Sequence, residues 1–240
     1  MRTVGILGKG GVGKTTLAIN LACAISHLQK KVALVDLNTA TSHISVELGN
    51  VPQSTLHDSM INGERMEDAL HPQFNIFTLP TALGLSNPDN INLASVGAKI
   101  REALSDFEIV ILDSAPGLGK EALATIQASD DVILVVNPTM TSVADAIKLK
   151  QIVLRMGVNP LGLVVNKYGG RWFELKPEEI SGIVELPLLA TIKDDENFLK
   201  SEAMRTPLIF YKSTRAEEFF KLASFLTGKQ YKLRYKYGFF

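Results

Sequence analysis

The sequence of 240 residues contains one cysteine, Cys23, and four histidines. A single thiol excludes an intramolecular disulfide and leaves no C-x-x-C pair for zinc or redox chemistry. It also argues against an iron–sulfur cluster, which takes several cysteine ligands. Cys23 lies among apolar neighbours, and we expect it to pack in the core. The histidines (His27, His43, His57 and His71) show no metal-ligand spacing with cysteines or acids, so we expect them to be surface or loop residues.

The sequence also lacks an excess of charge of either sign. The 25 basic residues are balanced by 25 acidic residues, so the formal net charge at pH 7 is +0. This balance argues against bulk electrostatic attraction to DNA and leaves a local basic patch open. No apolar run approaches the ~20 residues of a membrane-spanning helix, and no signal peptide precedes the first expected strand. With a hydrophobic content of 46%, we expect a globular, cytoplasmic protein.

A glycine-rich stretch near the N-terminus organises the rest of the chain. Residues 8–15 read GKGGVGKT and match G-x-x-x-x-G-K-[ST], the loop that cradles phosphates. A short apolar run at residues 3–7 predicts a buried strand before it, and residues 16–22 begin a helix after it. Lys14 is expected to reach the β- and γ-phosphates, and the Thr15 hydroxyl to ligate Mg²⁺. The alternative is a glycine-rich turn without a ligand. The expected nucleotide contacts in this stretch are Gly8, Lys9, Gly10, Gly11, Val12, Gly13, Lys14, Thr15 and Thr16.

A lysine directly after the first glycine distinguishes this loop. With Lys9 in that position, the stretch resembles the deviant Walker-A ATPases of the MinD/ParA family. The resemblance runs from about residue 3 to about residue 228 and is most specific at the phosphate loop. It implies that ATP or ADP binds with Mg²⁺, that ATP binding brings two copies together as a homodimer, and that Lys9 reaches the phosphate of the other copy. The alternative for Lys9 is a solvated lysine at a loop tip.

The order of expected elements predicts an α/β fold. Strands alternate with helices throughout, and the strands are nearly all apolar, which favours a parallel sheet covered on both faces. We expect one three-layer α/β/α P-loop NTPase domain with a mostly parallel twisted sheet over residues 1–228, followed by a basic-aromatic tail at 229–240. The expected strands are 3–7, 31–36, 74–80, 107–113, 131–136, 161–166 and 187–192. The expected helices begin near 16 and 55 and cover 89–104, 117–127, 141–156, 177–183 and 214–228. Residues 37–49 are expected to form a switch loop.

Asp113 ends a predicted strand and is followed by the glycine-containing stretch 114–119. This pattern resembles a Walker B carboxylate that runs into a second switch loop. Such an aspartate helps to hold Mg²⁺, usually through water. The alternative is a structural aspartate that caps the next helix.

Asp36 and Asn38 bear on turnover. The MinD/ParA pattern has Asp-x-Asp here; its first carboxylate helps to hold the Mg²⁺ shell and its second orients the attacking water. This chain reads Asp36-Leu37-Asn38. Asn38 can accept a hydrogen bond from water but cannot take a proton, so we expect slow hydrolysis. Asp36, or a residue from 39–43, could compensate. The resemblance therefore assigns catalytic roles to Lys9, Lys14, Asp36 and Asn38, and Mg²⁺ binding to Thr15, Asp36 and Asp113.

Two asparagines at strand ends are candidates for contacts with the base. Related ATPases use an asparagine at the position of Asn166 to hydrogen-bond adenine, and Asn137 resembles another family element near the base or a switch. Either residue could instead make an ordinary strand-end turn. The family's proline before the acidic loop is absent from Ile192-Lys193-Asp194-Asp195, which leaves base contacts from that loop open.

The tail at 229–240 contains no acidic residue and alternates basic with aromatic or apolar residues. The amphipathic membrane-binding helix of MinD proteins would repeat every 3.6 residues, whereas this alternation favours an extended strand. The tail could pair with a sheet edge, contact anionic lipid or contact nucleic acid. In a loop after Asn166, Arg171 and Trp172 could line the nucleotide mouth or a partner surface, although core or plain surface roles are simpler.

The resemblance implies a MinD-like ATP-dependent dimeric switch, in cell-division placement or spatial positioning, with a protein activator or cargo. The stretch at 56–58, followed by 63–64 and 69–70, also resembles MinD-type sequences. The alternatives are a ParA-like DNA-segregation ATPase, an ATP-binding module with impaired hydrolysis, and a metal- or cofactor-loading ATPase. The neutral net charge makes DNA the weaker partner, and a peripheral membrane location through the tail stays open.

Overall fold

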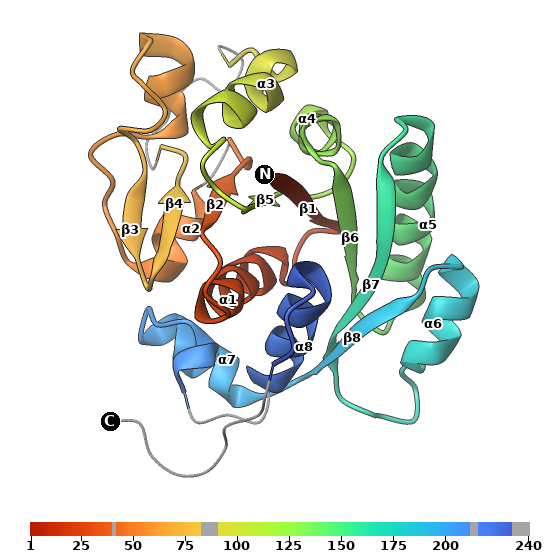
Figure 1. The fold of residues 1–240 in the computed structure, drawn as a ribbon. Coiled ribbons are helices and arrows are strands. Elements are labelled where there is room, and N and C mark those ends of the chain that lie inside the picture. The colour runs from red at the N-terminus through yellow and green to blue at the C-terminus, as the bar shows by residue number, and fades with distance from the viewer. Residues whose placement is uncertain (40–41, 83–90, 212–215, 232–240) are drawn as a thin grey trace.

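One sheet forms the centre of the molecule. The computed structural model describes residues 1–39, 42–82, 91–211 and 216–231, and within them eight strands pair in the order β3-β4-β2-β5-β1-β6-β7-β8 (Figure 1). Among these described strands only β3 runs antiparallel to its neighbour, which confirms the predicted mostly parallel sheet. The strands are β1 (Arg2–Gly8), β2 (Val32–Asp36), β3 (His71–Gln73), β4 (Ile76–Leu79), β5 (Ile109–Asp113), β6 (Asp131–Val136), β7 (Asn159–Tyr168) and β8 (Leu188–Lys193).

Helices cover both faces of the sheet (Figure 1). One face carries α1 (Lys14–His27), α2 (His43–Leu48), α7 (Glu196–Ala203) and α8 (Ala216–Thr227), whose apolar residues pack into one cluster with the strands. The other face carries α3 (Leu93–Ala103), α4 (Lys120–Ala128), α5 (Met140–Arg155) and α6 (Pro177–Val184) over two further clusters. This is the predicted three-layer α/β/α arrangement.

The strands are apolar on both sides because both sides are covered. In β1, Val4 and Ile6 pack toward α1, whereas Leu7 packs into the cluster that includes α5. All residues of β2, β5 and β6 are buried. Cys23 is also buried, on α1, as predicted.

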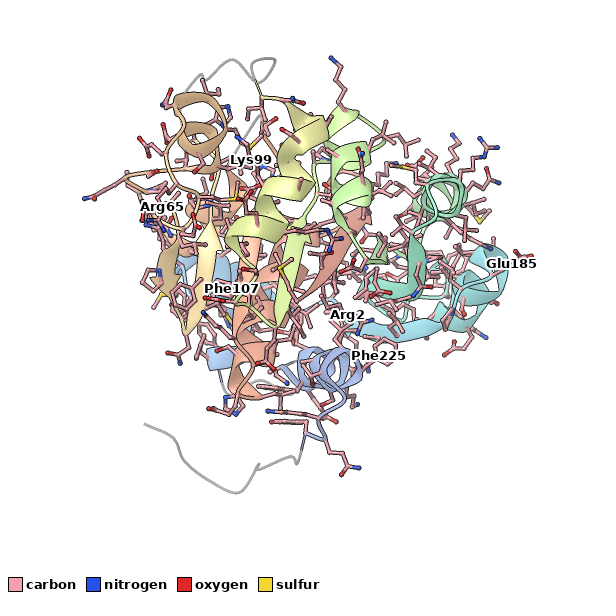
Figure 2. The ribbon with its side chains drawn as sticks, turned by 45° about the horizontal axis from the view of Figure 1, so that its top comes forward. Arg2, Arg65, Lys99, Phe107, Glu185 and Phe225 are labelled. Carbon is pink, nitrogen blue, oxygen red and sulfur yellow. The ribbon has the colours of Figure 1, made fainter. Side chains whose placement is uncertain are left out.

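Arg2 ties three elements together at the end of β1 that is remote from the glycine-rich loop. Its Nε donates to Oδ2 of Asp131 on β6 at 2.6 Å, and its Nη1 donates to the carbonyl of Leu226 on α8 at 3.1 Å. Figure 2 shows Arg2 beside α8, on which Phe225 is also labelled. This clamp fixes α8 against the central strands, away from the edge at which the strands' carboxyl ends meet.

Several local predictions were incomplete. The strand expected at 74–80 starts only at Ile76, as β4, and forms a hairpin with the unpredicted strand β3, because Phe74 and Asn75 both have positive φ, 51° and 61°, and turn the chain. The expected switch loop at 37–49 contains helix α2, which Ile44 and Leu48 anchor in the core. Helix α7 was not predicted; its N-cap Asp195 accepts from the backbone N–H of Asn197 at 2.9 Å.

Thr55 and Asp58 cap the turn that begins near residue 55, where a helix was expected. The Thr55 backbone N–H and hydroxyl both donate to Oδ2 of Asp58, at 2.9 and 2.6 Å, before a π-helical turn, η1 (Asp58–Asn62). The start of the helix predicted at 214–228 falls partly outside the described residues, as do the first two residues of the helix predicted at 89–104. The described residues also include a short 3₁₀ turn, η3 (Leu208–Phe210). In the described ranges, no helix has both the length and the apolarity that a membrane crossing requires.

Candidate functional site

The glycine-rich loop joins β1 to α1, as predicted. Gly11 and Gly13 have φ of 77° and 90°, a conformation that favours glycine. Helix α1 begins at Lys14. The backbone N–H groups of its first turn and the helix dipole favour an anion at this end. The Lys14 ammonium folds back over the loop and donates to the Lys9 carbonyl at 3.1 Å. Burial lowers the pKa of Lys14, and the nearby Asp113 carboxylate opposes this shift.

The sheet order brings two predicted carboxylates next to each other. Asp36 and Asp113 are register partners at the ends of adjacent strands β2 and β5, and they are 0% and 1% exposed. Burial, followed by the charge of Asp113, raises the pKa of Asp36. Burial also raises the pKa of Asp113 to about 6, against the opposing effects of Thr15 and Lys14. Two buried carboxylates side by side favour a bound cation.

Thr15 completes this cation-binding arrangement. Its hydroxyl donates to Oδ2 of Asp113 at 2.6 Å, while Oδ1 of Asp113 is buried and has no hydrogen-bond partner within the described residues. A hydroxyl and carboxylate oxygens are the ligand types that Mg²⁺ takes. The orphaned oxygen and the neighbouring carboxylate therefore fit Mg²⁺, with Thr15, Asp36 and Asp113 as the residues that would hold it directly or through water.

The segment after β5 lies against the glycine-rich loop. The backbone N–H of Ser114 donates to the Ile6 carbonyl at 3.3 Å, and that of Gly117 donates to the Gly8 carbonyl at 3.4 Å. A Cβ on Gly10 would lie 3.5 Å from the Cβ of Pro116. The predicted second switch thus contacts the phosphate loop, so a ligand in the loop and the position of this segment are physically linked.

The segment after β2 is held over the same edge. Oδ1 of Asp36 accepts from the Asn38 backbone N–H at 3.0 Å, and the Thr81 hydroxyl donates to the Asn38 carbonyl at 3.1 Å. Nδ2 of Asn38 lies 3.3 Å from Nδ1 of His43. Thr39 donates from its hydroxyl to Oε1 of Glu121 at 3.2 Å. Asn38 itself is buried, with 4% exposure, so its backbone is fixed and its amide faces an imidazole.

Asn166, at the carboxyl end of β7, is bonded to the glycine-rich loop. Its Nδ2 donates to the Val12 carbonyl at 2.7 Å, and the adjacent Lys167 donates from Nζ to the Gly11 carbonyl at 2.9 Å. A Cβ on Gly13 would collide with Nδ2 of Asn166. The predicted base residue therefore supports the loop in this structure and lines a cavity beside it.

That cavity has a volume of about 470 Å³ and opens next to Gly13 and Thr16. It adjoins the amino end of α1, where the glycine-rich loop ends. Glu47 of α2 lies in its wall, where Oε1 accepts from the Thr16 hydroxyl at 3.3 Å. Burial, with smaller effects from Asp113 and Glu202, raises the pKa of Glu47 to about 8. The other lining residues are Ile19, Asn20, Leu48, Asn166, Lys167, Lys193, Asp194, Asp195, Glu196, Phe198, Leu199, Ser201, Glu202, Thr206 and Pro207.

The sequence did not single out Glu47 as a site residue. In the sequence, Glu47 stands out only as the one acidic residue in the stretch 44–50. Asp194 and Asp195 of the acidic loop both line the cavity. Asp195 is also the N-cap of α7, so a helix begins directly after this loop, which lacks the family's proline. Asn137 lies outside this cavity: it lines a separate hollow with Met140 and Phe173, and its backbone N–H donates to the Ser142 hydroxyl at 3.0 Å.

Lys9 points toward α5. Its Nζ lies 3.9 Å from Oδ2 of Asp145, and the two side chains are 44% and 40% exposed. An exposed ion pair at that distance contributes little stability. The Lys9 ammonium is therefore available at the surface beside the loop, while Lys14 occupies the loop itself.

Three further residues were expected on the surface or in loops. Trp172 is 95% exposed, and Arg171 pairs with Glu174 and Asp194 at 3.0 and 3.5 Å. His57 is the exception among the histidines: it is buried, with 4% exposure, because the turn that follows Thr55 packs into the fold. Burial lowers the pKa of His57. The surface expectation was therefore wrong for this residue.

Comparison with known proteins identifies the family. The model of the CobQ/CobB/MinD/ParA nucleotide binding domain matches residues 6–208. The chain belongs to this MinD/ParA family. An uncharacterized ATP-binding protein of Methanocaldococcus jannaschii is 31% identical over 95% of this chain and 88% of its own length. The chromosome-partitioning ATPase Soj of Thermus thermophilus is 35% identical over 68% of each chain.

A solved MinD/ParA structure shares the fold closely. The septum site-determining protein MinD of Pyrococcus horikoshii, complexed with Mg-ADP, superimposes with a TM-score of 0.89 at 28% identity and covers 94% of this chain and 96% of its own. The predicted P-loop NTPase fold and the family resemblance are thereby confirmed.

Proposed function

We propose that this MinD/ParA chain is an ATP-dependent dimeric switch of the MinD type. The observation that carries the proposal is the convergence of Lys14, Thr15, Asp36 and Asp113 at the carboxyl ends of β1, β2 and β5, next to a nucleoside-sized cavity. The related MinD of Pyrococcus horikoshii has been solved in complex with Mg-ADP. ATP and Mg²⁺ assemble two copies, the dimer presents a surface to an activator or cargo, and hydrolysis resets it.

Adenine is the base that Asn166 favours. The Nδ2 of Asn166 donates to the Val12 carbonyl. The group that this amide offers to a base is therefore its acceptor oxygen, Oδ1. The 6-amino group of adenine can donate to that oxygen, whereas the 6-oxo group of guanine would meet it with another acceptor. The cavity beside Asn166 therefore suits ATP and ADP better than GTP and GDP.

The phosphates would lie on the glycine-rich loop, with the Lys14 ammonium against the β- and γ-phosphates. Thr15 and Asp113, with Asp36 beside them, would hold Mg²⁺, which when bound neutralises charge that develops during phosphoryl transfer. The buried carboxylates of Asp36 and Asp113 would hold this ion at the strand ends. Charge stabilisation and positioning supply most of the rate of such reactions, so this geometry supports hydrolysis.

Turnover should be slow because Asn38 stands where the family pattern has a second aspartate. An amide accepts a hydrogen bond from water without carrying charge or taking a proton. The comparison is steady-state phosphate release by wild type and Asn38→Asp at saturating Mg-ATP. A higher rate in the variant supports this assignment, and an unchanged or lower rate contradicts it.

Dimerisation rests on Lys9. Its exposed ammonium lies 3.9 Å from the exposed Asp145 carboxylate. Because such a pair contributes little free energy, Lys9 can leave it at little cost to bind the phosphate of a second copy. Size-exclusion chromatography with light scattering should give a dimer with Mg-ATP and a monomer with Mg-ADP. Lys9→Ala should bind ATP and stay monomeric, whereas Lys14→Ala should lose ATP binding and dimerisation together. A Lys9→Ala variant that dimerises as wild type does would contradict the cross-dimer role.

Cell-division placement is the cellular role we infer first, from the likeness to MinD. The likeness to the chromosome-partitioning ATPase Soj supports a DNA-segregation role as the second candidate. The ATP-bound dimer separates them: co-sedimentation with anionic liposomes supports the first role, and salt-sensitive DNA binding supports the second. Truncation after residue 228 tests whether the tail carries either interaction.

A further inference from the structure

Asn38 raises a physical problem that a carboxylate does not have. A carboxylate has two equivalent acceptor oxygens, whereas an amide has one acceptor and one donor. Only the orientation that turns Oδ1 toward the attacking water can accept its hydrogen bond. An amide that replaces the family carboxylate therefore needs a neighbour that fixes its direction.

His43, the first residue of α2, is placed to do this. Nδ2 of Asn38 lies 3.3 Å from Nδ1 of His43. Since an amide nitrogen can only donate, Nδ1 is the acceptor, and the ring proton is on Nε2. This contact turns Nδ2 toward the imidazole and Oδ1 away from it.

The backbone on both sides of this contact is held in place. Asp36 and Thr81 hold the Asn38 backbone from both sides, at 3.0 and 3.1 Å. The first turn of α2 is held as well, because the Ile44 backbone N–H is 3.5 Å from Oδ2 of Asp36. The His43 ring also lies within the field of the phosphate-binding Lys14: desolvation and then the Lys14 charge lower the pKa of His43, which favours the neutral ring that can accept at Nδ1.

We propose that His43 is a positioning residue that orients the Asn38 amide for water attack, and this proposal rests on the ATPase function proposed above. In the reaction, the water oxygen bonds to the γ-phosphorus while the bond from that phosphorus to the bridging oxygen breaks. ADP leaves with the electron pair, and the water proton passes to a γ-phosphate oxygen. Asn38 accepts a hydrogen bond from the water through Oδ1, and His43 holds Nδ2 on the opposite side.

The test is single-turnover hydrolysis of bound ATP in four forms: wild type, His43→Ala, Asn38→Asp and the double variant. The loss of one orienting hydrogen bond should slow His43→Ala by about 3- to 10-fold relative to wild type. ATP affinity, measured separately, should stay unchanged. In the Asn38→Asp background the same change should have an effect of less than about 2-fold, because either carboxylate oxygen can face the water.

A rescue pair separates orientation from packing. The side-chain oxygen of asparagine can take the place of Nδ1, so His43→Asn should recover most of the wild-type rate, whereas His43→Leu, which fills similar space without an acceptor, should behave as His43→Ala does. Equal losses in the wild-type and Asn38→Asp backgrounds, no loss in His43→Ala, or rescue by His43→Leu would each overturn the proposal. Absence of turnover in wild type despite ATP binding would overturn the ATPase function as well, which distinguishes the two failures.

Discussion

Replacing Gly13 by alanine tests how the glycine-rich loop is supported. Gly13 has a φ of 90°, and a Cβ there would collide with Nδ2 of Asn166. The positive φ alone costs an L-residue about 1–2 kcal/mol. If the Asn166 amide rotates away, its 2.7 Å bond to the Val12 carbonyl is lost and a buried acceptor is left, which costs a further ~1–3 kcal/mol. The free energy of unfolding should therefore fall by about 2–5 kcal/mol.

Gly63→Ala is the matched control. Gly63 also has a positive φ, 75°, but nothing lies within 4 Å of its would-be Cβ. It should lose only the backbone part, about 1–2 kcal/mol, and keep ATP affinity, whereas Gly13→Ala should bind ATP at least ~10-fold more weakly because the amino end of α1 shifts. Urea denaturation and ATP titration measure both quantities. Equal losses of stability in the two variants would refute the role assigned to the Asn166 contact.

Three further predictions concern charge and packing. Burial raises the pKa of Asp113 to about 6 and of Glu47 to about 8; since both exceed the unfolded values, the stability that their protonated forms contribute is complete at low pH and is lost as the pH rises through those values. The free energy of unfolding of the nucleotide-free protein should be measured from about pH 4 to about pH 9. Its decline with rising pH should be flatter than in wild type for Asp113→Asn below about pH 6 and for Glu47→Gln up to about pH 8. Slopes equal to those of wild type would contradict this. Phe107→Ala should lower the free energy of unfolding by about 3–5 kcal/mol, because this buried ring packs edge-on against Phe77 with centroids 5.3 Å apart, whereas the exposed Trp172→Ala should stay within about 0.5 kcal/mol; similar losses in both would contradict the packing argument.

The periodicity of the sequence predicted the elements that form the core. Strand β6 has the predicted bounds, and β1, β5 and α5 differ from theirs by one or two residues, because long apolar or amphipathic runs carry their own signal. The elements that were missed depend on tertiary packing. Helix α2 has six residues and is held by Ile44 and Leu48 in the core, while the turn between β3 and β4 uses two non-glycine residues at positive φ.

The site divides in the same way. The fixed spacing of the loop motif indicated Lys14 and Thr15 directly, and the place of Asp113 at the end of an apolar strand indicated that residue. The contact between Asn38 and His43 and the position of Glu47 in the cavity wall could not be predicted, because both depend on where α2 packs. Asn166 was expected to contact a base, which stays a prediction; in the structure its amide supports the loop through Val12.

The central claim is that the glycine-rich loop and the two buried carboxylates form a Mg-ATP site. Isothermal titration of Mg-ATP into the chain, stripped of any co-purified nucleotide, tests it most directly. The account predicts saturable binding of one ATP to each chain, with binding lost in Lys14→Ala and strongly weakened when Mg²⁺ is chelated. A stripped, folded wild-type protein that takes up no adenine nucleotide with Mg²⁺ present would contradict it.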